Sequence, residues 1–389
     1  MEKVRLGDIA TLINGDRGKN YPSQADITDE GDTPFVNAGH LNGRNIDFEE
    51  MNYISQDKYK RLSSGKFVKG DVLYCLRGSL GKKAIVNDDV EGAIASSLVI
   101  IRPDHDRIDG DYLMFSLDSP SIKEQLNKAN NGSSQPNLSA ASVREYQIEL
   151  PDLKKQKDIV KKLVKTRSII DSRQHEIDLL DELIKARFVE VFGDMVLNPN
   201  GWDQYQLGEV CDVRDGTHDS PQYYSEGYPL VTSKNLSGGK IDLTDCSLIC
   251  EDDYQKINQR SKVDYGDILM PMIGTVGNPV IVDLEPEFAI KNVALIKFKE
   301  DSKVLNIFVK TLLQSDYFDN AVISKVRGGT QKFISLGDIR KLEICLPPIE
   351  VQENYGEFVK QVDKSKVAVQ KALDEAQLLF NSLMQEYFG

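Results

Sequence analysis

The sequence of 389 residues lacks a long apolar run and has only five cysteines. No apolar stretch approaches the ~20 residues of a membrane span, and the segment Met1–Arg5 lacks the apolar core of a signal peptide. The small, odd number of cysteines predicts reduced thiols in a cytoplasmic protein rather than a disulfide framework. No second Cys or His pair accompanies Cys246 and Cys250, so we do not expect a zinc site. The cysteines are Cys75, Cys211, Cys246, Cys250 and Cys345.

The chain also lacks a basic domain. Its net charge is −13, divided as −5 over residues 1–151, +2 over 152–192, −7 over 193–347 and −3 over 348–389. Domains that bind nucleic acid usually carry a basic surface. Any contact with DNA must therefore rest on local patches, while the acidic remainder faces solvent or protein partners.

No set of residues has the spacing of a catalytic site. The segment Arg77–Lys83 contains a Gly-Lys pair but lacks the spacing and the Ser or Thr of a phosphate-binding loop. Leu346 precedes Pro347-Pro348, where an amino-methyltransferase loop needs Asn or Asp. The histidines are scattered at His40, His105, His175 and His218. We therefore expect that the chain is not itself an enzyme and binds no metal.

Two long segments with coiled-coil periodicity are present instead. Residues 152–192 contain no Gly or Pro, which predicts one helix of roughly 55–60 Å at about 1.5 Å per residue. Residues 347–389 repeat the pattern, and both segments end in Phe-Gly. A helix this long needs a partner, and we expect the second segment to supply it. The apolar seam positions are Leu163, Ile170, Ile177, Leu180, Ile184 and Val191, with Val362, Val369, Leu373, Ala376, Phe380 and Leu383.

The repeat extends beyond these helices. Val143–Pro151 aligns with Ile339–Pro347 at an offset of 196 residues, and both read as strands stopped by proline. A period this long indicates a duplicated domain rather than a solenoid, whose repeats run ~20–50 residues. The expected class is α+β, with domains at 1–151 and 194–347 and long helices at 152–193 and 348–389. Strands are expected at Phe67–Leu76, Ala95–Arg102, Asp267–Ile273 and Ala289–Phe298, with shorter helices near Gly110–Ala129 and Val304–Ser324.

Polar loops recur in both halves and combine glycine with Arg, Lys, Asn, Gln, Ser and Thr. Arg and Lys suit phosphates or guanine, Asn and Gln suit adenine, and glycine lets the backbone approach closely. Any single loop is more simply explained as an ordinary turn, whereas the recurrence of such loops in both halves favours a role in binding. The candidate DNA contacts are Arg17, Lys19, Asn20, Arg44, Arg77, Ser79, Lys82, Lys83, Asn131, Ser134, Gln135, Asn137, Thr217, His218, Lys234, Asn235, Thr275, Asn278, Arg327, Thr330, Gln331 and Lys332.

With these features together, the chain resembles the specificity subunits of type I restriction-modification enzymes over essentially its whole length. The resemblance rests on the duplicated layout and on short sequence motifs that occur in a fixed order. These are Asn200-Gly201-Trp202 before Leu207–Val210, Asp215–His218 before Pro229–Asn235, and Gly329–Gln331 before Leu346–Pro348.

The resemblance implies two target recognition domains joined by an antiparallel coiled coil with pseudo-twofold symmetry. Each domain would read half of a bipartite, asymmetric site on double-stranded DNA. The helices would set the spacing and dock two modification (methyltransferase) subunits in a phage-defence complex for DNA methylation and cleavage. S-adenosylmethionine would be bound by those subunits, and ATP and Mg²⁺ by restriction motor-nuclease subunits, with no cofactor on this chain.

The family often has a Glu-Gln pair just inside each long helix, whereas here Lys155 precedes Gln156 and Val351 precedes Gln352. This departure leaves the expected fold unchanged but bears on partner contacts at these positions. Two alternatives remain open at this point: a coiled-coil scaffold that holds two protein partners without DNA, and a specificity module of a related phage-defence system.

Overall fold

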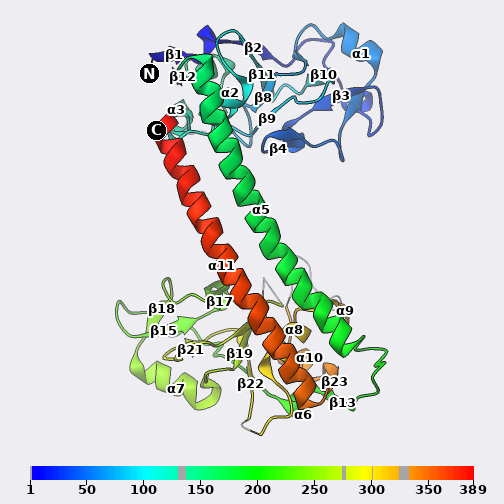
Figure 1. Ribbon diagram of the computed structural model, residues 1–389, viewed down its shortest axis with the longest axis vertical. Coiled ribbons are helices and arrows are strands. Elements are labelled where there is room, and N and C mark those ends of the chain that lie inside the picture. The colour runs from blue at the N-terminus through cyan, green and yellow to red at the C-terminus, as the bar shows by residue number, and fades with distance from the viewer. Residues whose placement is uncertain (1, 130–136, 274–276, 300, 324–332) are drawn as a thin grey trace. The chain divides into compact units, whose positions relative to one another are not determined.

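The computed structural model describes residues 2–129, 137–273, 277–299, 301–323 and 333–389 (Figure 1). The chain divides into two compact units: unit 1 is Met1–Gln174 with Lys371–Gly389, and unit 2 is His175–Gln370. Each unit therefore contains one globule and half of each long helix. The long helices are α5, Leu153–Phe192, and α11, Ile349–Phe388, with 40 residues each. Within the described ranges, no helix is long and apolar enough to cross a membrane.

Unit 1 is built on a four-stranded sheet in the order β2-β11-β8-β9 and a second in the order β6-β3-β10-β7. Short helices connect the strands, and β1 pairs with β12 where the globule meets α5. The strands are β1 Glu2–Arg5, β2 Ala10–Asn14, β3 Thr33–Val36, β4 Leu41–Asn42, β5 Asn45–Ile46, β6 Tyr53–Ile54, β7 Lys66–Phe67, β8 Val72–Cys75, β9 Lys83–Ile85, β10 Gly92–Ile94, β11 Leu98–Pro103 and β12 Gln147–Leu150. The helices of the globule are α1 Gln56–Arg61, α2 Gly110–Ser116, α3 Pro120–Ala129 and α4 Ala140–Arg144.

Unit 2 repeats this plan. Its central sheet has the order β14-β22-β19-β20, its second sheet has the order β18-β15-β21, and β13 pairs with β23. The strands are β13 Gln204–Gln206, β14 Asp212–Asp215, β15 Tyr228–Val231, β16 Leu236–Ser237, β17 Lys240–Ile241, β18 Ser247–Ile249, β19 Ile268–Pro271, β20 Val280–Ile281, β21 Ala289–Ile290, β22 Val293–Lys297 and β23 Glu343–Cys345. The helices are α6 Leu207–Val210, α7 Glu251–Ser261, α8 Asn306–Leu312, α9 Asp316–Ala321 and α10 Leu336–Arg340.

The central sheet of each unit is buried on both faces. Successive side chains of a strand point to opposite faces, and in β8 Val72 and Tyr74 enter one apolar cluster while Leu73 and Cys75 enter another. The first cluster includes residues of α2, α5 and α11, so helices cover that face. In unit 2, β19 divides in the same way, with Met270 facing the helices and Leu269 facing away from them.

The long helices pack together within each unit, and they run antiparallel there. In unit 1 the beginning of α5 lies beside the end of α11 (Figure 1). The Lys162 ammonium donates to the Tyr387 hydroxyl at 3.0 Å, and the Arg167 guanidinium lies 4.4 Å from the centre of the Phe380 ring. In unit 2 the end of α5 lies beside the beginning of α11, where Lys366 Nζ contacts Asp181 Oδ1 at 2.5 Å.

All twelve predicted seam residues are buried or half-buried. Leu163, Ile170, Ala376 and Phe380 belong to the core of unit 1. Thr166, a polar position in the seam of α5, is also buried, and its hydroxyl donates to the Lys162 carbonyl at 2.9 Å. The hydroxyl thereby satisfies its hydrogen bond within its own helix.

A buried glutamine anchors each long helix to its globule. In unit 1, Gln156 Oε1 accepts from the Asp109 amide at 2.8 Å, and its Nε2 donates to the carbonyls of Arg107 and Pro151 at 2.9 and 2.8 Å. The side chain is fully buried. It therefore faces the globule rather than an outside partner.

Gln352 makes the same three bonds in unit 2. Its Oε1 accepts from the Leu305 amide at 2.8 Å, and its Nε2 donates to the carbonyls of Lys303 and Pro347 at 3.0 and 2.8 Å. This residue is also fully buried. The repeated glutamine is thus explained by the helix-to-globule joint.

Several predicted elements are interrupted by turns. The strand expected at Phe67–Leu76 is split because Gly70, at φ 89°, turns the chain between β7 and β8. The one expected at Ala289–Phe298 is split at Asn292, which has φ 54°. The strand expected from Val143 begins only at Gln147, because the preceding residues form α4, capped by Ser139. The strand expected from Ile339 likewise begins at Glu343, after α10.

The glutamine joint gives a first prediction. Gln156→Leu leaves the three backbone groups that bond to this buried side chain without their partners, so it should lower the free energy of unfolding by about 2–4 kcal/mol. Hydrogen exchange should speed up at the Asp109 amide but not at Leu305, and Gln352→Leu should give the reverse. The exposed neighbours provide controls, Lys157→Leu and Glu353→Leu. Equal protection of both amides in both glutamine variants would contradict the assignment.

Candidate nucleic-acid interface

The topology of unit 1 brings its polar loops to one edge of the central sheet. Strands β2 and β8 both pair antiparallel with β11, where Asn14 lies opposite Val99 and Cys75 lies opposite Leu98. The C-terminal ends of β2 and β8 therefore meet the N-terminal end of β11. We call the loops at this edge, residues 15–20, 77–82 and 95–97, the loop edge of unit 1.

Unit 2 has the same arrangement. Strands β14 and β19 both pair antiparallel with β22, where Asp215 lies opposite Ala294 and Pro271 lies opposite Val293. The loop edge of unit 2 accordingly comprises residues 216–220, 272–278 and 291–292, of which 274–276 lie outside the described residues. The polar loops that were predicted to contact DNA are therefore gathered at one sheet edge in each unit.

Hydrogen bonds tie the loops of unit 1 together. Arg17 Nη2 donates to the Ser96 carbonyl at 3.4 Å, and Lys82 Nζ donates to the Gly39 carbonyl at 3.4 Å. Arg77 and Asn137 form an isolated antiparallel bridge. These contacts bring together loops that are up to 79 residues apart in the sequence.

Asp16 braces the loop that carries Arg17 and Lys19. Its buried carboxylate accepts from the amides of Gly18 and Ser63, each at 2.7 Å. The Gly18 bond, followed by the Ser63 bond, lowers the pKa of Asp16 despite its burial. The loop is therefore held by a carboxylate at neutral pH, with Arg17, Lys19, Arg77 and Ser79 exposed at the surface.

The loop edge of unit 2 is held by a different set of contacts. His218 lies between Asp215 Oδ2 and Asn292 Oδ1, each at 2.8 Å. Lys291 Nζ donates to the Ser220 hydroxyl at 2.8 Å. Thr217 is half-buried, whereas Lys234 and Asn278 are exposed.

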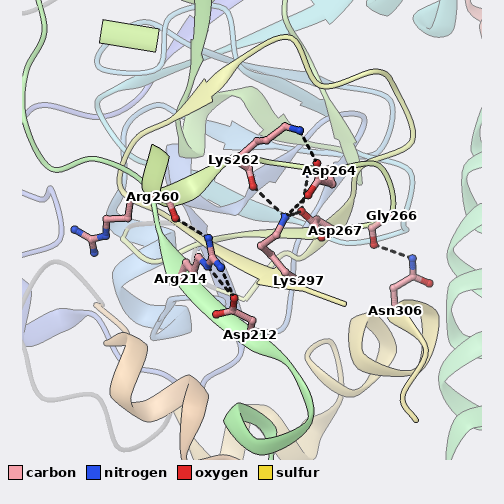
Figure 2. Close-up of polar contacts among 9 residues, drawn as sticks. All are labelled: Asp212, Arg214, Arg260, Lys262, Asp264, Gly266, Asp267, Lys297 and Asn306. Atoms are coloured by element: carbon pink, nitrogen blue, oxygen red, sulfur yellow. Dashed lines mark hydrogen bonds and ion pairs between the residues drawn. The ribbon is translucent and has the colours of Figure 1, made fainter. Parts of the chain in front are cut away.

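At the opposite end of the central sheet, where Asp212 pairs with Lys297, a polar network fixes the segment between α7 and β19. Figure 2 shows Lys297 between Asp264 and Asp267, at 2.8 and 2.6 Å, and Arg214 joined both to Asp212 and to the Arg260 carbonyl. Burial raises the pKa of Asp267, and the Lys297 bond opposes that shift. In unit 1 the corresponding pair is Asp71 with Arg102, joined by two bonds of 2.8 and 2.7 Å.

Two predicted contacts, Lys83 and Asn235, are buried in the scaffold, so these expectations are corrected; a third, Arg44, is half-buried in an ion pair. Lys83 is buried against Asp118, and burial lowers the pKa of its ammonium, which Asp118 partly offsets. Asn235 is buried and closes the turn after β15 through Thr232. Arg44 pairs with Asp111 and lies 4.6 Å from the Phe115 ring centre.

These three were candidates because they lie in polar loops. Membership of a polar loop does not distinguish side chains that point into the protein from those that point to solvent. Asn20 is intermediate, since its amide donates to the Arg61 carbonyl at 3.0 Å. Eight further candidates lie outside the described residues, namely Asn131, Ser134, Gln135, Thr275, Arg327, Thr330, Gln331 and Lys332.

Two apolar residues were not predicted: one lies in the loop edge of unit 2, and the other is bridged to it. Ile273 and Phe333 form an isolated bridge and are 36% and 49% exposed. They stand 196 residues after Arg77 and Asn137, which form the corresponding bridge in unit 1. The repeat offset would have found them, but a search for polar residues excluded them.

No group of three or more His, Cys, Asp or Glu residues suited to a metal occurs in the described part of the chain. The five cysteines are free thiols. Cys246 and Cys250 in particular do not pair, and burial raises the pKa of Cys246.

Comparison with known proteins gives a consistent result. The model of the type I restriction modification DNA specificity domain matches residues 1–182 and again residues 199–376. The chain is 25% identical over 406 residues to the type I restriction enzyme MjaVIII specificity subunit of Methanocaldococcus jannaschii, covering 95% of this chain and 89% of the relative. It is 21% identical over 410 residues to the EcoKI specificity subunit of Escherichia coli strain K12, covering 98% and 86%.

Two solved structures share the fold. A crystal structure of the S subunit of a type I restriction-modification system from M. genitalium has a TM-score of 0.57 at 16% identity, covering 100% of this chain and 96% of that one. A chain from a study of complex assembly and conformational transition of the type I restriction-modification system has a TM-score of 0.60 at 21% identity, covering 100% and 97%.

The contrast between exposed and buried lysine and arginine side chains gives a second prediction. Arg77→Ala removes an exposed cation from the loop edge, so it should weaken duplex binding and lower the slope of log affinity against log salt by about one unit. Lys83→Met removes a buried cation and should leave the slope unchanged. Titration of a labelled duplex at several salt concentrations measures the slope for each variant. Equal slopes in wild type and Arg77→Ala would show that Arg77 does not contact the duplex.

Proposed function

The chain belongs to the type I restriction-modification DNA specificity family, and from this we infer that each globule reads one half of a bipartite, asymmetric DNA site. The two loop edges are the reading surfaces. The chain itself performs no catalysis in this proposal. The comparisons do not favour a scaffold that works without DNA.

The observation that carries this proposal is the duplicated loop edge with different side chains at matching positions. Arg77 and Asn137 in unit 1 correspond to Ile273 and Phe333 in unit 2, in the same bridge geometry. Arg and Asn suit guanine, adenine or phosphate, whereas apolar side chains suit the thymine methyl group. The two loop edges share one backbone arrangement but carry different side chains. This combination fits a DNA site whose two halves differ in sequence.

The long helices set the distance between the two half-sites in this proposal. Each is continuous over 40 residues, and a continuous paired helix holds a distance that a flexible linker would not. The separation of the half-sites matters because a DNA duplex presents the same face once per helical turn, about every 34 Å.

Partner subunits supply the chemistry. We assign S-adenosylmethionine to two modification subunits, and ATP and Mg²⁺ to a restriction motor-nuclease. Apolar side chains on both helices support docking there: Leu183 and Leu379, which are 46% and 52% exposed, stand 196 residues apart at equivalent positions. Gln156 and Gln352 are excluded from such docking by their burial. Basic surfaces on the partners would complete a clamp around DNA that this chain, with net charge −13, does not form alone.

The experiment that tests the function is methylome sequencing of cells with and without this gene. We expect one bipartite, asymmetric adenine-methylation motif to disappear when the gene is deleted and to return with the wild-type gene. An unchanged methylome, in cells where the neighbouring methyltransferase is expressed, would overturn the proposal.

The spacer role gives a separate prediction. Three heptads inserted after Gln174 and after Gln370 lengthen both helices by about 31 Å, close to one duplex turn of about 34 Å. Sites selected from a random duplex library should keep both half-sites, with a gap longer by about one turn. A single heptad in each helix puts the half-sites out of rotational phase and should weaken bipartite binding. An unchanged gap in the three-heptad protein would show that the helices do not measure the site.

A further inference from the structure

Arg17 and His218 occupy the same position in the two repeats. Each is the third residue after the first strand of its central sheet, β2 ending at Asn14 and β14 ending at Asp215. The sequence offset between them is 201, the offset of the repeat at its N-terminal end. Both side chains are exposed. The duplicated frame therefore places a basic side chain at one point of each loop edge.

Both residues also contact the equivalent turn. Arg17 donates to the Ser96 carbonyl, and His218 contacts Asn292. Ser96 lies two residues after β10, which ends at Ile94, and Asn292 lies two residues after β21. The equivalence of Arg17 and His218 therefore rests on two independent features, the strand that precedes each residue and the turn that each residue contacts.

A glycine makes this contact possible in each unit. A Cβ atom on Gly15 would lie 2.7 Å from the Ala95 carbonyl oxygen, and one on Gly216 would lie closer still to the Ile290 carbonyl oxygen. Any larger residue would push the loop away from the turn. The backbone is therefore held where Arg17 and His218 reach the surface of their loop edges.

The surroundings of His218 favour its charged form. Asp215 Oδ2 and Asn292 Oδ1 both accept hydrogen bonds, and only the imidazolium has a donor on each ring nitrogen. Asp215 is buried, and its other oxygen pairs with Arg260 of α7. Lys291, in the same turn as Asn292, is bonded to Ser220 instead.

The balance of these groups raises the pKa of His218 above its ordinary value of 6.5. The bond to Asn292 is the largest cause, followed by the bond to Asp215, while burial and the Arg260 charge act in the opposite direction. A raised pKa in the folded state means that this stabilisation is fully present below about pH 6.5 and is lost as the pH rises through the folded pKa.

We propose that this shared position is a DNA-phosphate contact in both recognition domains, made by a permanent cation at Arg17 and by a titratable one at His218. The proposal rests on the DNA-reading function proposed above. A phosphate oxygen replaces Asn292 at Nδ1 of His218, while Asp215 keeps Nε2 and fixes the ring. The side chain of His218 is 60% exposed, so a phosphate can reach it. Binding to the second half-site therefore weakens with rising pH, whereas binding to the first does not.

The test compares duplex affinity across pH for the wild type and three variants of the full chain, each assembled with the modification subunits. The probe is a labelled random-sequence duplex, followed by the duplex motif obtained from the methylome. Wild type should lose about tenfold in affinity between about pH 6 and pH 8.5, because one charge-assisted bond is lost. His218→Arg should remain tight across this range, and His218→Gln should be weak and flat. Arg17→Gln should bind duplex more weakly at every pH, but the ratio of its affinities at about pH 6 and pH 8.5 should equal that of the wild type.

The outcomes separate this inference from the function on which it rests. If wild type and His218→Gln bind duplex with the same pH ratio, the inference fails and DNA reading stands. If no version binds any duplex even when it is assembled with the modification subunits, both fail. An NMR titration checks the mechanism directly, because the His218 signal is the one lost in His218→Gln. Its pKa should rise when duplex is added, and a pKa unchanged by duplex would overturn the inference.

Discussion

The apolar character of both faces of each central sheet is the constraint on which the rest of the structure depends. One face packs against the second sheet, so the other must be covered by helices. Two helices from distant parts of the chain supply this cover. In unit 1 the Phe388 ring at the end of α11 lies 5.1 Å from the Tyr112 ring, and in unit 2 Phe192 at the end of α5 lies 4.9 Å from Phe308. The long helices are therefore part of the domain cores, which explains why the compact units divide each helix in its middle.

Once both faces of the central sheet are covered, only its edges remain for binding. Because β2 and β8 run in the same direction on either side of β11, the loops after them and the turn before β11 lie together as the loop edge. Buried acids then fix each loop edge from behind. Asp16 holds its loop in unit 1, and Asp215 holds His218 in unit 2. Placing loops on a rigid two-layer support is a common way to position binding residues. Here the arrangement has been made twice from one design.

Much of this was predictable from the sequence, because it depends on periodicity. Heptads, the offset of 196 residues and strands stopped by proline indicated the duplicated α+β fold and both long helices. Side-chain direction was not predictable in the same way. Lys83 and Arg77 belong to one polar loop, yet Lys83 begins β9 and points into the core. The role of Gln156 was hidden as well, because its three partners are backbone groups that come close only in the folded protein.

The duplication also separates framework from recognition without any second sequence. Residues that the fold requires recur at matching positions with the same chemistry, such as Gln156 with Gln352 and Asp71 with Asp267. Each pair is buried and bonded to backbone or to an opposite charge. At the loop edges, by contrast, some matching positions carry different chemistry. Arg77 and Ile273 are one such pair. A frame that tolerates Arg in one copy and Ile in the other imposes no choice at this position, which leaves it available for recognition.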